Sequence, residues 1–415
     1  MPCGRSPPRI DRARKGSAIA LPVPIAPLPR GGTVVDGACD PRFEPVREAF
    51  AGNFSEHDEL GAAVCVYVGG RCVVDLWGGH RDAQRSAAWR RDTLVNAYSV
   101  GKGILAALAL LLVERGRLEL DTSVTRLWPA FASGDKQATT LRMLLSHRAG
   151  LPSVRRRLPE GAMFDWRLMC DALAEQRPFW TPGEAHGYHV NTFGFLVGEL
   201  VRRATGQDVG SALRERLTGP LEAGFFFGLP REEHARVAPV VAWDEPLLGR
   251  DAWARVFPPT GDDERDTMIW HSYFNPSGLS GAGAVNTPAW RLAQMPSTNG
   301  HADARGVAAI YAALLRGELV SNALLGEATR VYSEGEDRVL GRASRFGLGF
   351  QLEEVGGRFG PSGEAFGHYG YGGSLGFADP DAGLAVGYLT NRPGERFRAP
   401  RAQRLVDAVY AALGA

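Results

Sequence analysis

The chain has 415 residues, of which 44% are hydrophobic and 22% are charged, as in ordinary soluble globular proteins. This length accommodates one large domain or two ordinary domains with a sizeable core. The 47 Lys and Arg residues balance the 46 Asp and Glu residues to a net charge of +1, so neither nucleic acid nor an anionic membrane is expected as a partner.

Targeting and metal-binding signals are weak in this sequence. Five cysteines without a Cys-x-x-Cys pair indicate neither a zinc site nor a disulfide framework, and no metal or cofactor is expected. The longest apolar run, 104–113, is too short to cross a bilayer. Prolines interrupt any signal-peptide core in residues 1–32, which we interpret as a flexible extension of a cytoplasmic protein. An unusual export signal or a mis-assigned start codon is the alternative, and nothing in the sequence indicates an oligomeric state.

Hydrophobic spacing predicts the order of helices and strands. Two apolar runs, 62–68 and 72–77, joined by Gly69-Gly70-Arg71, predict a hairpin. Residues 207–290 are rich in Pro, Gly and charge, which predicts irregular structure with short helices. Further strands are predicted at 346–352 and 383–389, with a glycine-dense stretch between them. Helices are predicted at 41–56, 98–115, 141–146, 193–204, 304–316 and 402–413.

Strands therefore occur at both ends of the chain and helices in the middle. If the terminal strands share one sheet, the helical middle is an insertion. This predicts a discontinuous α/β domain formed by residues 33–96 and 285–415, and a mostly helical domain of residues 97–284.

The segment Ser99-Val100-Gly101-Lys102 is the principal candidate for chemistry, because it stands at the start of the predicted helix 98–115. Residues three apart share a helical face, so the Lys amine can reach the Ser hydroxyl. A helix N-terminus also offers free N–H groups to a developing oxyanion. A buried Lys can lose its proton and act as a base, which Arg cannot do.

Lysine is rare in this chain, which makes Lys102 more informative. Only three of the 47 cationic residues are Lys, and Lys102 is flanked by apolar residues. The alternative is that Ser99 only caps the helix and Lys102 is solvated. A second match to the pattern, Ser133 to Lys136, lies in a polar loop with no helix behind it, and we interpret it as chance.

Two further segments contain candidate partners. Tyr188 precedes the predicted helix 193–204, and its phenol is a candidate base if a nearby Lys ammonium lowers its pKa. The alternative is a core Tyr. The stretch 366–373, Phe-Gly-His-Tyr-Gly-Tyr-Gly-Gly, contains His368 and glycines that allow a backbone to approach a ligand closely. The alternative there is a plain hairpin turn.

Together these blocks resemble the penicillin-recognising serine hydrolases, in particular class C β-lactamases and family VIII carboxylesterases. The resemblance covers residues 40–412 and rests on the order and spacing of four blocks. It implies an α+β fold, with an antiparallel sheet flanked by helices, an inserted mostly helical domain, and the active site between them. The four blocks are Ser99 to Lys102, Leu144 to Pro152, the Tyr188 segment, and Gly367-His368-Tyr369-Gly370.

The resemblance implies a role for each matching residue. Ser99 corresponds to the acylated nucleophile, and Lys102 and Tyr188 to its activating pair, with Tyr188 later passing the proton to the leaving group. Gly370 holds the strand close to substrate, and the oxyanion hole is formed by the backbone N–H groups of Ser99 and Tyr371. His368 stands where the family's third motif has Lys or His.

Two departures from the β-lactamase pattern favour esters over β-lactams as substrates. Val190 fills the third position of the usual Tyr-x-Asn block, and Asn191 comes one residue later. His368 replaces the Lys that would hold a β-lactam carboxylate, so that cation is missing or titratable. The His-x-Gly motif is instead similar to that of family VIII esterases.

Other residues of chemical interest have simpler interpretations. Gly372-Gly373-Ser374-Leu375-Gly376 matches the Gly-x-Ser-x-Gly elbow, but a strand rather than a helix is expected after Ser374. Aromatic residues are candidates for an acyl or alcohol pocket, although each one taken singly is more often a core residue. The candidates are Trp180, Tyr273 and Phe274, together with Trp270 and Tyr371.

The sequence therefore predicts a serine carboxylesterase that acts on a small-molecule ester, short-chain or aryl, through an acyl-Ser99 intermediate, with weak β-lactam hydrolysis as a side activity. One alternative keeps the fold and changes the reaction to that of a β-lactamase, a D,D-peptidase or amide hydrolase, or an acyltransferase. A second alternative is a non-catalytic scaffold. Retention of Ser99, Lys102, Tyr188 and His368 together argues against the scaffold.

Overall fold

The computed structural model describes residues 34–241, 257–353, 357–394 and 400–414. The extension predicted for residues 1–32 lies outside this described part. Within it, the structure contains no helix with both the length and the apolar character needed to cross a bilayer.

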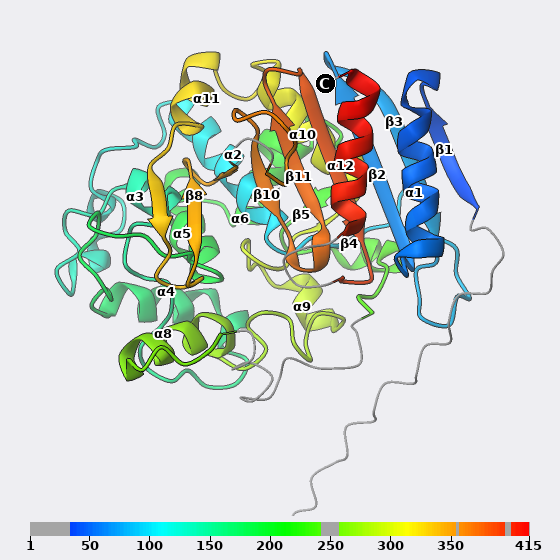
Figure 1. The fold of residues 1–415 in the computed structure, drawn as a ribbon. Coiled ribbons are helices and arrows are strands. Elements are labelled where there is room, and N and C mark those ends of the chain that lie inside the picture. The colour runs from blue at the N-terminus through cyan, green and yellow to red at the C-terminus, as the bar shows by residue number, and fades with distance from the viewer. Residues whose placement is uncertain (1–33, 242–256, 354–356, 395–399, 415) are drawn as a thin grey trace, which may run out of the picture.

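An antiparallel sheet forms the centre of the fold (Figure 1). Over the described residues it has nine strands, in the order β1-β3-β2-β12-β11-β10-β9-β8-β7. Because β2 pairs with β12, the two ends of the chain build one sheet, as predicted. The strands are β1 (Val35–Cys39), β2 (Gly61–Val68), β3 (Arg71–Gly79), β7 (Ser333–Glu336), β8 (Ala343–Phe346), β9 (Gln351–Leu352), β10 (Phe366–Tyr369), β11 (Leu375–Asp379) and β12 (Leu384–Thr390).

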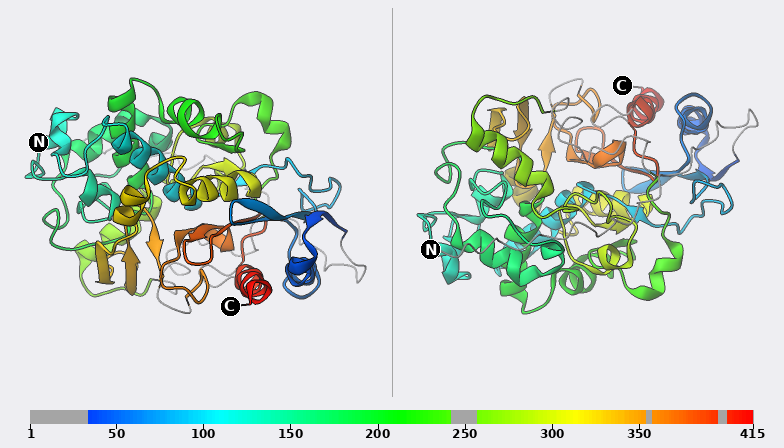
Figure 2. Two further views of the ribbon diagram at one scale, coloured as in Figure 1. Left: turned by 90° about the horizontal axis from the view of Figure 1, so that it is seen from above. Right: turned by 90° about the horizontal axis from the view of Figure 1, so that it is seen from below.

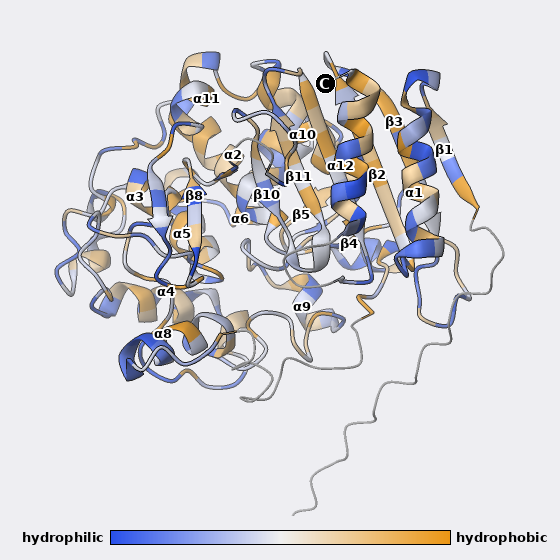
Figure 3. Cartoon of the chain, in the orientation of Figure 1, coloured by the Kyte–Doolittle hydropathy of each residue, from blue (hydrophilic) through white to orange (hydrophobic). Residues whose placement is uncertain are grey.

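Helices cover both faces of the sheet (Figure 2). Helices α1 (Glu44–Glu56) and α12 (Pro400–Leu413) lie side by side on one face, and α2 (Val100–Glu114) and α10 (Ala304–Leu315) lie on the other. Successive strand residues point to opposite faces, so Val64 and Val66 of β2 pack toward α1 and α12, whereas Ala63 and Cys65 pack toward α2 and α10. The central strands are accordingly apolar along most of their length (Figure 3).

The other helices lie mainly in the middle of the chain, to one side of the sheet (Figure 1). A small three-stranded sheet of the described residues, β4-β6-β5, joins that region to the segment before α10. The division into two domains at residues 97 and 284 stays a prediction.

The remaining helices and the strands of the small sheet have the following bounds: α3 (Leu141–Leu145), α4 (Trp166–Glu175), α5 (Thr192–Thr205), α6 (Val209–Leu213), α8 (Asp263–Phe274), α9 (Pro288–Leu292), α11 (Asn322–Ala328), β4 (Val95–Asn96), β5 (Phe225–Phe226) and β6 (His301–Ala302).

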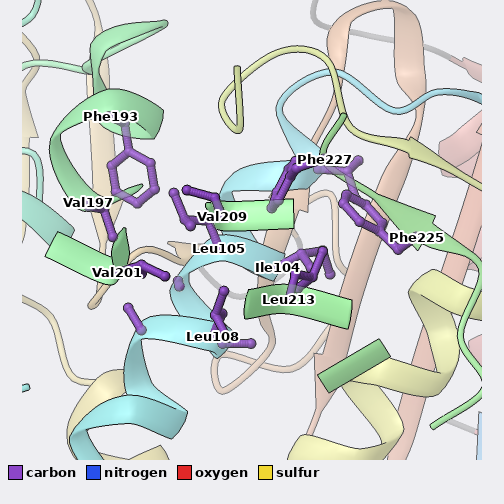
Figure 4. Close-up of a cluster of buried hydrophobic side chains, with 14 of the residues drawn as sticks. Ile104, Leu105, Leu108, Phe193, Val197, Val201, Val209, Leu213, Phe225 and Phe227 are labelled. Atoms are coloured by element: carbon purple, nitrogen blue, oxygen red, sulfur yellow. The ribbon is translucent and has the colours of Figure 1, made fainter. Parts of the chain in front are cut away.

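Helix α2 is buried on all sides over its first 13 residues, 100–112, so tertiary packing fixes its position. It ends next to Gly116, whose φ of +64° suits a residue without a side chain. The apolar residues of α2 pack against α5, α6 and the segment around β5 (Figure 4). The residues labelled there are Ile104, Leu105, Leu108, Phe193, Val197, Val201, Val209, Leu213, Phe225 and Phe227.

Two sequence predictions of elements need correction. The predicted strand 346–352 is wrong, because β8 ends at Phe346 and β9 begins at Gln351, with a turn between them in which Gly349 has a φ of +83°. The hairpin of β7 and β8, residues 333–346, was not predicted, because Ser333-Glu334-Gly335-Glu336 is polar and has no apolar alternation.

Candidate active site

Ser99 and Lys102 lie together at the start of α2, as their spacing predicts. The Lys102 Nζ atom lies 3.0 Å from the Ser99 Oγ atom. Ser99 is partly exposed, whereas Tyr98 and Val100 on either side of it are buried. Tyr98 has a φ of +49°, a left-handed conformation that is uncommon for an aromatic residue and is found disproportionately at functional sites. Ser99 is therefore partly open to solvent and has an amine beside its hydroxyl.

The environment of Lys102 favours an uncharged amine. Its side chain is fully buried, and its Nζ atom also lies 3.0 Å from the carbonyl oxygen of Ser297. Burial lowers the pKa of Lys102 well below its usual value of 10.5. A neutral amine can donate one N–H to the Ser297 carbonyl and keep its lone pair for the proton of Ser99. The arrangement therefore supplies a general base.

Lys136 of the second Ser-x-x-Lys match has a different environment. Its Nζ atom donates hydrogen bonds to the carbonyl oxygens of Ser133, Ala174 and Gln176. Burial lowers the pKa of Lys136 to about 8. Lys136 thus ties its own loop to the C-terminal end of α4. Because carbonyl oxygens only accept hydrogen bonds, it has no hydroxyl to activate among these partners.

Tyr188 contacts both Ser99 and Lys102. Its side chain is hydrogen-bonded to that of Ser99, and the Lys102 Nζ atom lies 4.8 Å from the centre of its ring. Burial raises the pKa of the Tyr188 phenol above its usual value of 10, although the hydrogen bond with Ser99 acts in the opposite direction. The expected lowering by a Lys ammonium is therefore wrong, because burial dominates here and also disfavours the ammonium form of Lys102.

His368 lies on β10 with its ring centre 5.9 Å from that of Tyr188. It is fully buried, and its Nδ1 atom lies 2.9 Å from the carbonyl oxygen of Tyr369, so this nitrogen carries the proton. Burial, and to a smaller extent Lys102, lower the pKa of His368 well below 6.5. The third motif therefore contributes a neutral imidazole at pH 7.

The end of β10 lies against the segment that precedes Ser99. A Cβ atom on Gly370 would lie only 2.6 Å from the carbonyl oxygen of Ala97, so a glycine is required for this approach. The next residue, Tyr371, places its ring 5.3 Å from the ring of Tyr98. The structure thus brings the two segments of the expected oxyanion hole together, and the roles of the Ser99 and Tyr371 amides stay a prediction.

The pocket candidates gather around Tyr188. Trp180 is buried in one apolar cluster with Tyr188, and Tyr273 and Phe274 of α8 pack against that cluster. Trp270 also packs there, with its ring 4.4 Å from that of Phe274. The aromatic candidates therefore share one apolar cluster with Tyr188 or pack against it, and a substrate-contacting role for them stays a prediction.

Ser374 does not have the surroundings of a nucleophile elbow. It is 1% exposed and precedes β11, a strand, so the turn between β10 and β11 is a hairpin as expected. Among the described residues, no cluster of His, Cys, Asp or Glu side chains is arranged to hold a metal ion.

Sequence reasoning missed three residues that contact the site. Ser297 accepts a hydrogen bond from Lys102, Asp337 accepts one from the backbone of Tyr188, and Phe346 stacks on the Tyr188 ring. Each stands in a loop or a polar hairpin far from Ser99 in the sequence. No local pattern in the sequence singles them out.

The sequence profile of one protein family, described as Beta-lactamase, matches residues 46–410. The chain belongs to the beta-lactamase family. It is 33% identical to the esterase/beta-lactamase LipL of Mycobacterium tuberculosis, over 88% of this chain and 84% of the relative.

Two solved structures of this fold are similar over nearly all of their length. A family VIII carboxylesterase superposes with a TM-score of 0.83 at 36% identity, covering 91% of this chain and 100% of that one. A penicillin-binding protein homolog from Caulobacter crescentus superposes with a TM-score of 0.83 at 37% identity, covering 92% and 100%. The relatives of this beta-lactamase-family chain therefore include proteins named as esterases and a protein named as a penicillin-binding protein homolog.

Proposed function

We propose that the chain is a serine carboxylesterase that hydrolyses short-chain or aryl esters through an acyl-Ser99 intermediate. The observation that carries the proposal is the 3.0 Å contact between the Ser99 hydroxyl and the amine of Lys102, whose burial favours its uncharged form. The names of LipL and of the family VIII carboxylesterase, both similar over most of this chain, support ester hydrolysis.

The reaction begins when Lys102 takes the proton of the Ser99 hydroxyl and the Oγ atom attacks the ester carbonyl carbon. The backbone N–H groups of Ser99 and Tyr371 stabilise the oxyanion that forms. Tyr188, whose raised pKa keeps the phenol protonated, passes a proton to the departing alkoxide and regains one from Lys102. Water then attacks the acyl carbon and releases the acid, which regenerates the Ser99 hydroxyl.

The neutral His368 favours an uncharged ester over a β-lactam as the substrate. A β-lactam antibiotic carries a carboxylate, which is held best by a fixed cation. The pKa of His368 lies well below 6.5, so its imidazole supplies no such charge at pH 7. Small neutral esters need only the oxyanion hole and apolar contacts such as the aromatic cluster around Trp180.

The rival reactions on the same fold are β-lactam hydrolysis, peptide or amide hydrolysis, and acyl transfer. The family name is the reason to test β-lactam hydrolysis, and the similarity to a penicillin-binding protein homolog is the reason to test peptide or amide hydrolysis. Faster turnover of nitrocefin than of p-nitrophenyl butyrate would favour a β-lactamase. Preferential transfer of the acyl group to an added alcohol over water would favour a transferase. A scaffold role would leave Ser99 unlabelled by a fluorophosphonate probe.

The decisive experiment compares Ser99→Ala with Ser374→Ala in hydrolysis of p-nitrophenyl butyrate. We expect the first variant to lose about 10³-fold or more in kcat/KM, because no acyl-enzyme can form. We expect the second variant to retain activity in its folded fraction, because Ser374 lies in a hairpin turn. Mapping of the covalent adduct by mass spectrometry should place it on Ser99. The opposite pattern in the two variants would overturn the proposal.

The cytoplasmic location expected from the sequence is part of this proposal. A small ester that diffuses within the cell would fit it, whereas a cell-wall substrate would require export. Fractionation of cells that express the full chain, with detection of the protein in each fraction, tests this point. Recovery in the cell envelope or the medium would contradict it.

A further inference from the structure

The position of Tyr188 needs an explanation outside its own segment. Residues 186–190 have no regular secondary structure, yet the Tyr188 phenol must stay within hydrogen-bond reach of Ser99 to act on it. Misplacement of a reacting group by about 1 Å can cost about 100-fold in rate. Some other part of the fold must therefore hold this residue.

The hairpin of β7 and β8 holds the backbone of Tyr188 through Asp337. Asp337 is fully buried, and both of its carboxylate oxygens lie 3.0 Å from the Tyr188 amide nitrogen. The same carboxylate accepts hydrogen bonds of 2.9 Å from the amides of Val339 and Leu340 and from the hydroxyl of Ser344. The turn thus fixes the carboxylate from one side, and the carboxylate fixes Tyr188 from the other.

The same hairpin holds the ring of Tyr188 through Phe346. The two rings are stacked, with centres 5.8 Å apart and planes 4° from parallel. Phe346 is 1% exposed and also contacts the ring of His147 edge-on, at 4.6 Å. A hydrogen bond of 2.6 Å from the Ser333 hydroxyl to the Ser146 carbonyl ties the base of the hairpin to the segment that carries His147. The ring of Phe346 therefore has little freedom to move.

We propose that Asp337 and Phe346 are positioning residues that act on catalysis through Tyr188. Asp337 accepts a hydrogen bond from the backbone amide of Tyr188, and Phe346 stacks on its ring. This inference rests on the proposed function, in which Tyr188 passes a proton to the leaving group. Burying a carboxylate costs desolvation free energy. The Asp337 carboxylate accepts hydrogen bonds only from its own hairpin and from one distant amide, that of Tyr188, among the contacts of the described residues. The hairpin thereby forms the edge of the sheet and also positions Tyr188, the proton donor of the site.

The test uses two butyrate esters with different leaving groups in the full-length protein. p-Nitrophenolate leaves without protonation, whereas ethoxide needs a proton, so a misplaced Tyr188 should affect ethyl butyrate more. We expect Asp337→Asn to lower kcat for ethyl butyrate about 10-fold to 100-fold, and kcat for p-nitrophenyl butyrate by about 3-fold or less. The matched control is Glu336→Gln, the exposed neighbour on β7, which should change neither.

A double-mutant comparison separates positioning from a general loss of structure. In a Tyr188→Phe background, Asp337→Asn should cost less than about 2-fold further on ethyl butyrate, because the group it positions is already gone. If Asp337→Asn fails to fold, Phe346→Leu replaces it. Phe350→Leu, at another buried ring that contacts Phe366, is then the control for loss of packing.

Equal losses on both esters, or losses that add to those of Tyr188→Phe, would overturn the positioning role. Failure of the proposed function would look different, since Ser99→Ala would then still hydrolyse both esters. Selective loss on ethyl butyrate together with non-additivity would support the inference. Neither outcome depends on an unchanged thermal unfolding midpoint, because leaving-group selectivity is measured on the folded fraction.

Discussion

Lys102 and Ser99 are 3.0 Å apart at their side-chain ends, although Lys102 is fully buried and Ser99 is partly exposed. The first turn of α2 thus spans the boundary between the core and the site. The amine lies in surroundings that disfavour its charge, while the residue whose hydroxyl it contacts is partly open to solvent. This combination makes a base from a residue that is normally an acid at neutral pH.

The two buried lysines should respond differently to the same substitution. Lys102→Met removes the base, and we expect kcat/KM for p-nitrophenyl butyrate to fall about 10³-fold or more. Lys136→Met leaves three carbonyl oxygens without their donor, and we expect it to cost about 1–3 kcal/mol in the free energy of unfolding with kcat nearly unchanged. Steady-state kinetics and urea denaturation of both variants check this. Similar activity losses in the two variants would contradict the assignment of Lys102.

The pH dependence of ester hydrolysis should follow Lys102. Activity requires its uncharged amine, so kcat/KM should rise as the pH rises through the lowered pKa of Lys102 and then level off well below pH 10.5. The phenol of Tyr188 has a raised pKa, so its ionisation adds no descending limb below about pH 10.

The check is a kcat/KM profile between about pH 5 and pH 10 for the wild type and His368→Asn. Because burial lowers the pKa of His368 well below 6.5, its imidazole is not the group that sets the ascending limb, which should stay at the same pH in the variant. Its disappearance in His368→Asn, or a fall in wild-type activity between about pH 7 and pH 9, would count against Lys102 as the titrating base.

The sequence predicts the local part of this site well and the long-range part poorly. Ser99 and Lys102 share one helical turn, so their spacing makes them candidates, and the resemblance to a known family adds His368 in its glycine-rich strand. The state of Tyr188 depends on its burial under Phe346 and beside His147, which are 158 and 41 residues away in the chain. No local pattern reports such packing, and this is why the direction of the Tyr188 pKa shift was predicted wrongly.

The distinction between local pattern and long-range packing also explains which strands of the sheet could be predicted from the sequence. Apolar strands such as β2 and β12 are predicted closely, because burial on both faces requires continuous apolar runs. The edge hairpin of β7 and β8 is polar and was missed, yet it carries Asp337 and Phe346. Edge strands need fewer apolar residues, so their sequences resemble loops.

A buried ion pair should be critical for the stability of the sheet. Glu59, which precedes β2, is fully buried, and it forms a 2.7 Å ion pair with Arg401 of α12, which is 2% exposed. Arg401→Met keeps most of the apolar stem but removes the cationic partner of the carboxylate, which keeps the hydrogen bonds from the hydroxyls of Tyr388 and Thr390. We expect it to cost about 3–5 kcal/mol in the free energy of unfolding.

Arg404→Met, on the same helix, is the matched control, because Arg404 pairs with the exposed Glu56. We expect a much smaller effect there, since solvent screens that pair. Urea denaturation of the two variants measures the difference. Equal destabilisation by both substitutions would show that the buried pair of Glu59 and Arg401 contributes no more to the free energy of unfolding than the exposed pair of Glu56 and Arg404.

Two helical glycines should respond to alanine with opposite signs. Gly103 follows Lys102 in α2, and a Cβ atom there would lie 2.2 Å from the hydroxyl oxygen of Tyr311, which is fully buried and cannot swing away. Gly103→Ala should therefore push α2 away from α10, cost about 1–3 kcal/mol in the free energy of unfolding, and displace Lys102 relative to Ser297 and Tyr188. A Cβ atom on Gly326 of α11 meets nothing within 4 Å. Gly326→Ala should stabilise the fold by about 0.4–1 kcal/mol, because alanine restricts the unfolded chain and favours helix.

Thermal or urea unfolding of the two glycine variants, together with p-nitrophenyl butyrate kinetics, distinguishes packing from propensity. If helix propensity governed both sites, both substitutions would stabilise the protein and leave kcat unchanged. Close packing at Gly103 predicts instead that stability and kcat fall together, with kcat reduced about 10-fold. The same small residue lets α2 approach α10 and so places Ser99 and Lys102 relative to Tyr188 and Ser297. A stable and fully active Gly103→Ala variant would contradict this prediction, because it would mean that α2 can shift without misplacing Ser99 and Lys102 in the site.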